Sequence, residues 1–141
     1  MAAVRRALAL ASVAALAWPV LGCGRETNHD VRTSIEQIAS ISAEGAIMAD
    51  DLARGRTKTT FVRVHGEELS SQAEHEAEKL SDAPVDPALH DRIEKAIGLA
   101  SEVSGAIDGM RVSPQDRRQA RQAEQDLNKW ADEARKLAGS I

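Results

Sequence analysis

The chain of 141 residues contains one cysteine, two tryptophans, one phenylalanine and no tyrosine. A single cysteine excludes an intramolecular disulfide, so in an oxidising compartment packing alone has to stabilise the fold. Scarce aromatic residues and abundant alanine favour closely packed helices over a β-sheet, because strands are enriched in aromatic and β-branched residues. The composition therefore predicts an all-α fold.

The sequence also lacks the motifs of the common enzyme classes. It has no glycine-flanked nucleophile, no phosphate-binding glycine-rich loop and no metalloprotease helix signature. The neighbouring carboxylates Asp50-Asp51 and Glu67-Glu68 point to different sides of a helix, so neither pair can work as a cooperating acid and base. The formal net charge of −4 is unlike that of a general nucleic-acid binder. We expect neither catalysis nor a nucleic-acid partner.

The first 23 residues have the three parts of an export signal. Arg5 and Arg6 precede an apolar stretch over residues 7–20, which is too short to cross about 30 Å of hydrocarbon. This stretch ends at Val20-Leu21-Gly22-Cys23, which resembles the lipobox of bacterial lipoprotein precursors in its aliphatic first residue and its small residue before the cysteine. The resemblance implies that residues 1–22 are a cleaved signal peptide. It also implies that Cys23 carries the lipid, with acyl chains such as palmitate.

The lipobox resemblance places the mature protein in the cell envelope, held on a membrane through its lipid anchor. Glycine rather than aspartate at position 24 resembles the sorting pattern for an outer membrane, where the host has one. In a host without one, the expected location is the outer face of the plasma membrane. Ordinary secretory cleavage after Ala15-Leu16-Ala17 stays open as an alternative, and it would leave Cys23 as a free thiol.

Cleavage before Cys23 leaves 119 residues, with 16 basic and 22 acidic side chains and a net charge near −6. This length is enough for one domain with a single core. Residues 24–30 are polar and without periodicity, so we expect residues 23–30 to be the lipidated cysteine and a short tether. The domain then covers residues 31–141.

Apolar or small residues recur every three or four positions in four segments of the domain. These run from Val31 to Leu52, Val62 to Leu80, Leu89 to Met110 and Ala120 to Ile141. The connections are short, so neighbouring helices should be antiparallel. The pattern predicts an antiparallel, up-down-up-down four-helix bundle. The main alternative is an elongated pair of helical hairpins that dimerises to complete its core, which leaves a homodimer open.

Local signals predict where these helices begin. Asp86-Pro87 and Ser113-Pro114 each combine an N-cap residue with a proline at the first helical position, and they should start the third and fourth helices. Thr57 or Thr59 is the expected cap of the second helix.

The apolar pattern also predicts which residues face one another. Folding the first two helices about a turn near residue 55 puts Gly45 and Gly66 at one level, which predicts closely approaching backbones. In the last two helices, Trp130 falls beside Ile93 and should be buried. On the second helix the inward position near residue 76 belongs either to Glu76 or to Ala77.

Helical bundles can hold haem or metal ions when core-facing side chains supply the ligands. The one Glu-x-x-His motif, Glu26 to His29, lies in the tether. His65 is on the inward shoulder of the second helix, and Met48 is at a similar height on the first. A hydrogen-bonded histidine lining a small core is the commoner arrangement, so we predict no cofactor. A bundle that binds haem, copper or another metal through His65 and Met48 is the alternative.

Charge is distributed unevenly along the predicted bundle. The turn after the first helix and the turn after the third lie at the same end, distal to the lipid. Basic residues gather there: Arg54, Arg56, Lys58, Arg63, Arg111, Arg117, Arg118 and Arg121. Cations at a helix start are mildly unfavourable, so Arg117 and Arg118 indicate a partner rather than a stabilising role. We expect this end to bind an anionic polymer or protein of the cell envelope.

Overall fold

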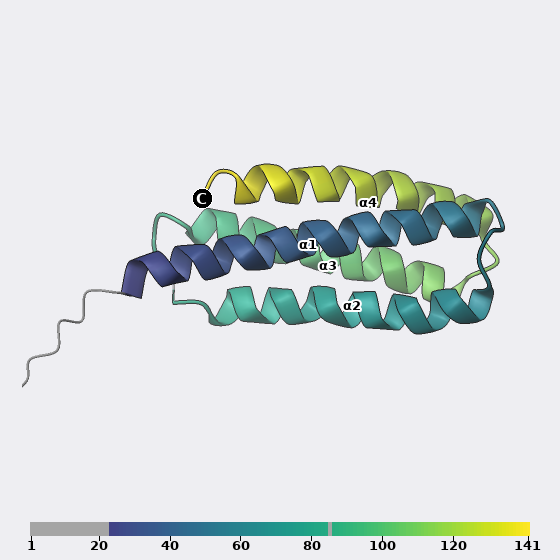
Figure 1. Ribbon diagram of the computed structural model, residues 1–141, viewed down its shortest axis with the longest axis horizontal. Helices are drawn as coiled ribbons and strands as arrows, with labels where there is room; N and C mark the ends of the chain where they lie inside the picture. Colours follow the sequence, from purple (N-terminus) through teal and green to yellow (C-terminus); the bar gives the residue numbers. More distant parts are fainter. Residues whose placement is uncertain (1–22, 85) are drawn as a thin grey trace, which may run out of the picture.

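The computed structural model describes residues 23–84 and 86–141 of the chain. It contains four α-helices and, within these ranges, no strand: α1 Cys23–Ala53, α2 Thr59–Asp82, α3 His90–Val112 and α4 Arg117–Ala138. Each helix runs opposite to the one before it, so the predicted up-down-up-down bundle is confirmed (Figure 1). The predicted signal peptide, residues 1–22, lies outside the described residues.

The four helices form two layers of two. α1 packs most extensively against α4, and α2 packs most extensively against α3. Contacts between α1 and α2, and between α3 and α4, are sparser, although these helices follow one another in the chain. The apolar pattern paired the inward faces of helices that follow one another in the chain, but the most extensive contacts are between α1 and α4 and between α2 and α3. Helical periodicity defines an inward face and does not say which neighbour covers it.

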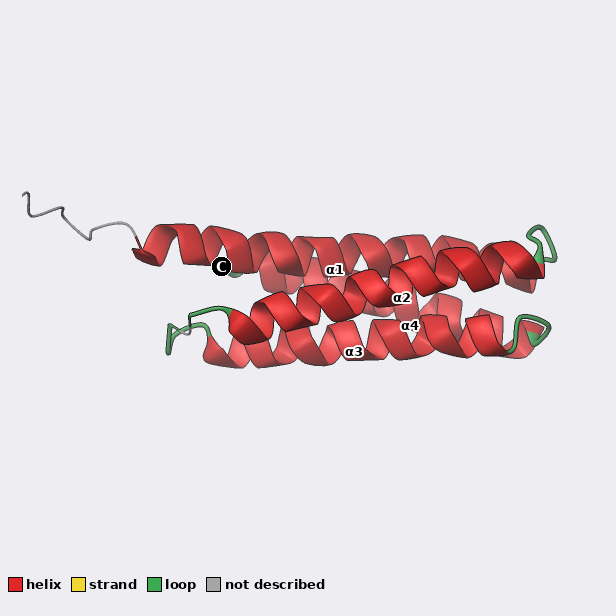
Figure 2. Cartoon of the chain, turned by 90° about the horizontal axis from the view of Figure 1, so that it is seen from below, coloured by secondary structure: helices red, strands yellow, loops and turns green. Residues whose placement is uncertain are grey.

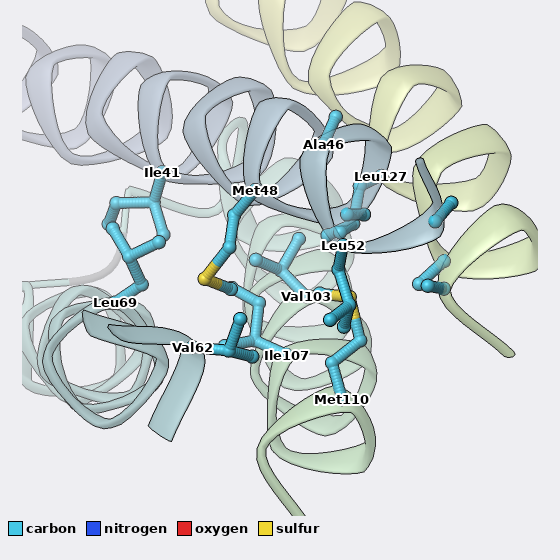
Figure 3. Close-up of a cluster of buried hydrophobic side chains, with 14 of the residues drawn as sticks. Ile41, Ala46, Met48, Leu52, Val62, Leu69, Val103, Ile107, Met110 and Leu127 are labelled. Carbon is cyan, nitrogen blue, oxygen red and sulfur yellow. The ribbon is translucent and has the colours of Figure 1, made fainter. Parts of the chain in front are cut away.

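The core is built from two clusters of buried side chains along the bundle. One cluster lies toward the turn between α1 and α2, where Met48, Leu52, Val62 and Ile107 come together from α1, α2 and α3 (Figure 3). The other lies toward the N-terminus of α1. Trp130 packs against both clusters and is only partly buried, so the prediction of a largely buried Trp130 is not confirmed.

Gly45 and Gly66 lie at one level of the bundle, as predicted, but for a different reason. A methyl group added at Gly45 would lie 3.2 Å from Cδ1 of Ile107, and one added at Gly66 would lie 3.6 Å from its Cγ2. Ile107 of α3 therefore fills the space between the two glycines. The nearest atoms at both positions belong to side chains, with those of Ile107 first at each, so the two glycines make room for side chains.

The helix starts differ from the predicted caps. The carboxylate of Asp116 accepts hydrogen bonds from the backbone N–H groups of Arg118 and Gln119, so Asp116 is the N-cap of α4, while Ser113 is the C-cap of α3. Lys58 is the N-cap residue of α2 and makes no side-chain capping bond. Asp86 accepts a hydrogen bond from Ala88 N–H at 2.9 Å, which closes a turn before α3 begins.

Two further features concern α1 and α2. α1 begins at Cys23, so residues 24–30 continue the helix and do not form an irregular link; they contain no proline that would end it. On α2 the inward position belongs to Glu76, which is 8% exposed, whereas Ala77 is partly buried.

Candidate interaction surface

The turn between α1 and α2 and the turn between α3 and α4 lie together at one end of the bundle (Figure 2). We call this the distal end, and the end that holds the start of α1 the proximal end. Gly55 closes α1 in the left-handed conformation, with φ of 69°. Its N–H bonds to the carbonyl of Leu52, and Arg56 N–H bonds to the carbonyl of Asp51. This hydrogen-bond pair, with glycine in the left-handed position, is a common helix ending.

Two of the predicted distal cations are engaged within the fold. Arg54 and Arg56 form ion pairs with Asp50, and Arg56 also pairs with Asp51 at 2.7 Å. Desolvation acts to raise the pKa of Asp50, but hydrogen bonds from Arg54 and Arg56 outweigh it and lower this pKa below its ordinary value. Hydrogen bonds to Asp51 and Asp50 raise the pKa of the Arg56 guanidinium. These charges stabilise the end of α1 and offer little to a ligand.

Arg111 is also paired within the fold, because it contacts Glu67 at 3.2 Å and Asp108 at 3.1 Å. Five other cations lie near the same end and are exposed. Among residues 23–84 and 86–141, no carboxylate lies within 4 Å of any of them. We call these five the distal basic surface: Lys58, Arg63, Arg117, Arg118 and Arg121.

The distal basic surface draws on both distal turns. A methyl group added at Gly55 would lie 3.0 Å from Nη2 of Arg117, so this guanidinium reaches from α4 across the turn between α1 and α2. Arg117 and Arg118 are the first two residues of α4, where the positive end of the helix dipole adds to their charge. The sequence prediction that the two turns gather basic side chains at one end is confirmed.

The proximal half carries the opposite charge. Exposed carboxylates come from the end of α2, the turn that follows it and the start of α3: Glu78, Asp82, Asp86, Asp91 and Glu94. Glu76 is buried beside them, and its Oε1 accepts a hydrogen bond from Lys79 at 2.7 Å. The bundle is therefore acidic at its proximal end and basic at its distal end.

His65 and Met48, the candidate haem or copper ligands, line the same groove between α1 and α2, which has a volume of about 650 Å³. Nε2 of His65 lies 2.9 Å from Oε1 of Glu44, and the imidazole packs on the ring of Phe61 at 5.0 Å. Met48 is 3% exposed and points into the core (Figure 3). The structure brings the two residues together, but a carboxylate already holds the imidazole.

The contact between His65 and Glu44 was not predicted from the sequence. Within the described residues it is the one side-chain hydrogen bond that crosses from the α1/α4 layer to the α2/α3 layer. The signal was present, because Glu44 and His65 fall at nearly the same level when α1 and α2 are folded about residue 55. Apolar spacing alone, however, does not show which polar side chains at one level bond to each other.

Neither a metal centre nor a membrane span is found in the part of the chain that the structure describes. No group of three or more His, Cys, Asp or Glu side chains there is placed to hold a metal ion. None of the described helices combines the length and the apolar character needed to cross a bilayer. No family model, curated protein or solved structure matches the chain.

Proposed function

We propose that the protein is a membrane-anchored lipoprotein of the cell envelope, and that its bundle is a non-enzymatic module which binds an anionic polymer of the envelope at the distal basic surface. One observation carries the binding proposal: five exposed cations gather at one end of an otherwise acidic domain, with no described carboxylate within 4 Å. Neighbouring cations without internal partners create a local positive potential that attracts a polyanion.

The placement of these cations supports a ligand role over a folding role. Arg117 and Arg118 stand at the start of α4, where a positive charge opposes the helix dipole. Arg54 and Arg111, by contrast, lie near helix ends and are paired with carboxylates, as stabilising residues would be. A linear polymer of phosphate or carboxylate groups could contact Lys58, Arg117 and Arg118 at once.

The test uses fluorescently labelled polyphosphate as a polyanion probe and follows its anisotropy at several salt concentrations. Replacing Lys58, Arg117 and Arg118 with glutamine should weaken binding at least about tenfold and flatten the salt dependence, because fewer counterions are released. The matched control replaces three exposed lysines outside this surface, Lys95, Lys129 and Lys136, with glutamine, and it should bind nearly as the parent does. Equal losses in both variants would show that only the net charge matters and would remove the distal basic surface from the proposal.

A further inference from the structure

The large apolar side chains that are exposed in the described chain all lie near the distal end of the bundle. We call these residues the distal apolar band: Ile47, Phe61, Val64 and Val112. Val112 ends α3 and Phe61 is the third residue of α2, so both stand directly beside a distal turn. Ile47 is the farthest from a turn, six residues before the end of α1, which is about 9 Å along the helix.

The distal basic surface occupies the same part of the bundle. Its members farthest from the distal turns, Arg63 and Arg121, are each the fifth residue of their helix, about 6 Å along it. The two distal turns with the adjoining seven residues of each helix cover residues 47–65 and 106–123. These ranges hold eight basic and four acidic residues, a net charge of +4. The rest of the chain from Cys23 onward holds eight basic and eighteen acidic residues, a net charge of −10.

The four acidic residues of this distal region are engaged within the fold. Asp50 and Asp51 pair with the arginines of the turn that follows α1, and Asp108 pairs with Arg111. Asp116 accepts two backbone hydrogen bonds as the N-cap of α4. The next carboxylate on each helix is about 10 Å or more from its distal turn. Exposed apolar side chains and free cations are therefore combined at one end of an acidic protein.

The distal apolar band surrounds the end of the bundle, because its members come from α1, α2 and α3, while α4 contributes three cations of the distal basic surface. A protein partner covers one face of a bundle, whereas a bilayer interface surrounds any end that enters it. Interfacial segments bury apolar side chains about 5 to 10 Å into the boundary between headgroups and acyl chains, and nearby Lys and Arg pair with anionic headgroups. The depth of the band, about 9 Å, matches that range.

We propose that the distal end binds the surface of an anionic lipid bilayer, with the distal apolar band inserted shallowly and the distal basic surface on the phosphate headgroups. The inference rests on the ligand role proposed above for the basic surface, and it adds the band, which a polyanion does not require. Bilayer and polyanion would compete for the same cations. Lipid on Cys23 is not needed for this contact.

A fluorophore at the distal turn tests the proposal in the full chain. An environment-sensitive dye is attached at Gln115→Cys, between α3 and α4, with Cys23→Ser so that one thiol is labelled. Its emission should shift to the blue on phosphatidylcholine vesicles with about one quarter phosphatidylglycerol. Pure phosphatidylcholine vesicles should leave it unchanged. The same dye at Ser101→Cys, exposed on α3 about 16 Å from Val112, should not shift on either. The dye reports its own surroundings, so binding through residues 7–20 alone would not shift it.

Two variants separate the bilayer from the polymer. The first combines Phe61→Ser, Val64→Ser and Val112→Ser, which leaves the charge unchanged. It should bind the anionic vesicles at least about tenfold more weakly and polyphosphate within about twofold of the parent. The second combines Lys58→Gln, Arg117→Gln and Arg118→Gln, and it should weaken both interactions at least about tenfold. All six positions are exposed, and circular dichroism checks that the variants stay folded.

The outcomes distinguish this inference from the proposed function. A dye at position 115 that stays in water on anionic vesicles overturns the bilayer contact, whether or not polyphosphate binds. Equal shifts on neutral and anionic vesicles, or unchanged vesicle binding by the serine variant, also overturn it. A parent chain that binds the vesicles and not polyphosphate would support the bilayer contact and overturn the polymer.

Discussion

Glu76 is the buried group whose surroundings satisfy it least. Its Oε1 accepts a hydrogen bond from Lys79, but its Oε2 is buried and has no hydrogen-bond partner among the described residues. A buried polar atom without a partner is destabilising by about 1 to 3 kcal/mol. Replacing a buried charged group with an apolar residue of similar volume is often neutral or stabilising.

We therefore expect Glu76→Met to stabilise the fold by about 1 kcal/mol in chemical denaturation. The matched change Glu78→Met, at a side chain 75% exposed, should alter stability by less than about 0.5 kcal/mol. If Glu76→Met instead destabilised the protein by more than about 1 kcal/mol, this expectation would be wrong. The ion pair with Lys79 would then stabilise the fold by more than the unpartnered Oε2 destabilises it.

Asp50 gives a prediction about pH. Its folded-state pKa lies below the ordinary value of 3.8, since the hydrogen bonds from Arg54 and Arg56 outweigh desolvation. A depressed folded pKa contributes stability above the ordinary value, and this contribution is lost as the pH falls through the folded pKa. Carboxyl titration by NMR should show the Asp50 pKa rise when Arg54 and Arg56 are both changed to glutamine. An unchanged titration would mean that the ion pairs do not form in solution.

The two interior glycines give a matched pair of substitutions. Added at Gly66, a methyl group would be in ordinary contact at 3.6 to 3.7 Å, whereas at Gly45 it would lie 3.2 to 3.3 Å from side chains of Ile107 and Leu127. Helix propensity favours alanine by about 1 kcal/mol at both sites. We expect Gly66→Ala to stabilise the fold and Gly45→Ala to be at least about 1 kcal/mol less favourable, because of overpacking. If the two substitutions changed the thermal unfolding midpoint equally, the tighter packing of Ile107 and Leu127 against Gly45 would be contradicted.

The sequence predicted which residues of α1 and α2 lie at the same level of the bundle. It did not predict which side chains pack between them. The count of residues about the turn at Gly55 placed Gly45 and Gly66 together. Nothing in the α1 and α2 segments shows that Ile107, about 40 residues further along the chain, fills the space between them. The same limit applies to Trp130, whose inward periodicity is real but whose place between two clusters depends on all four helices.

At the scale of elements, the start of α4 shows that one sequence signal, Ser113-Pro114, can mark either the start of a helix or the end of the helix before it. Ser113-Pro114 has the composition of an N-cap and first helical residue, yet Ser113 closes α3 and Asp116 caps α4. The three-residue spacing from Ser113 to Asp116 fits either reading, because both residues are favoured N-caps. Local composition located the break between the helices within a few residues, and only the backbone geometry decides which residue is the cap.

We expect Asp116→Ala to destabilise the bundle by about 1 kcal/mol, since it removes the acceptor of two backbone N–H groups. Ser113→Ala should change stability by less than about 0.5 kcal/mol. The free energy of unfolding from urea denaturation of both variants checks this assignment. The reverse order of effects would return the N-cap of α4 to Ser113.

Helix pairing is the part of the architecture that the sequence did not reveal. The number of helices, their order and their alternating directions follow from apolar spacing and short connections, and the structure confirms them. The close α1/α4 pairing joins the two ends of the domain, and it includes a buried hydrogen bond from Ser42 Oγ to the Leu127 carbonyl at 2.7 Å. A serine on an apolar stripe gives no indication of which helix will supply the carbonyl that accepts its hydrogen bond.

For the whole molecule, the proposal of a lipid anchor gives the most direct prediction. Cys23 is the one thiol in the chain, so it is the one residue that could carry a thioether-linked diacylglyceryl group. Cys23→Ser should either remain uncleaved or be released from membranes, as measured by fractionation and by the mass of the mature protein. A variant that matures and stays on the membrane as the parent does would exclude lipid anchoring through this residue.

The continuity of α1 has a consequence for spacing. A helix from Cys23 to Ala53 extends about 45 Å without a flexible joint, at about 1.5 Å per residue. If Cys23 carries the lipid, this fixed length sets how far from the membrane surface the distal basic surface can meet its ligand.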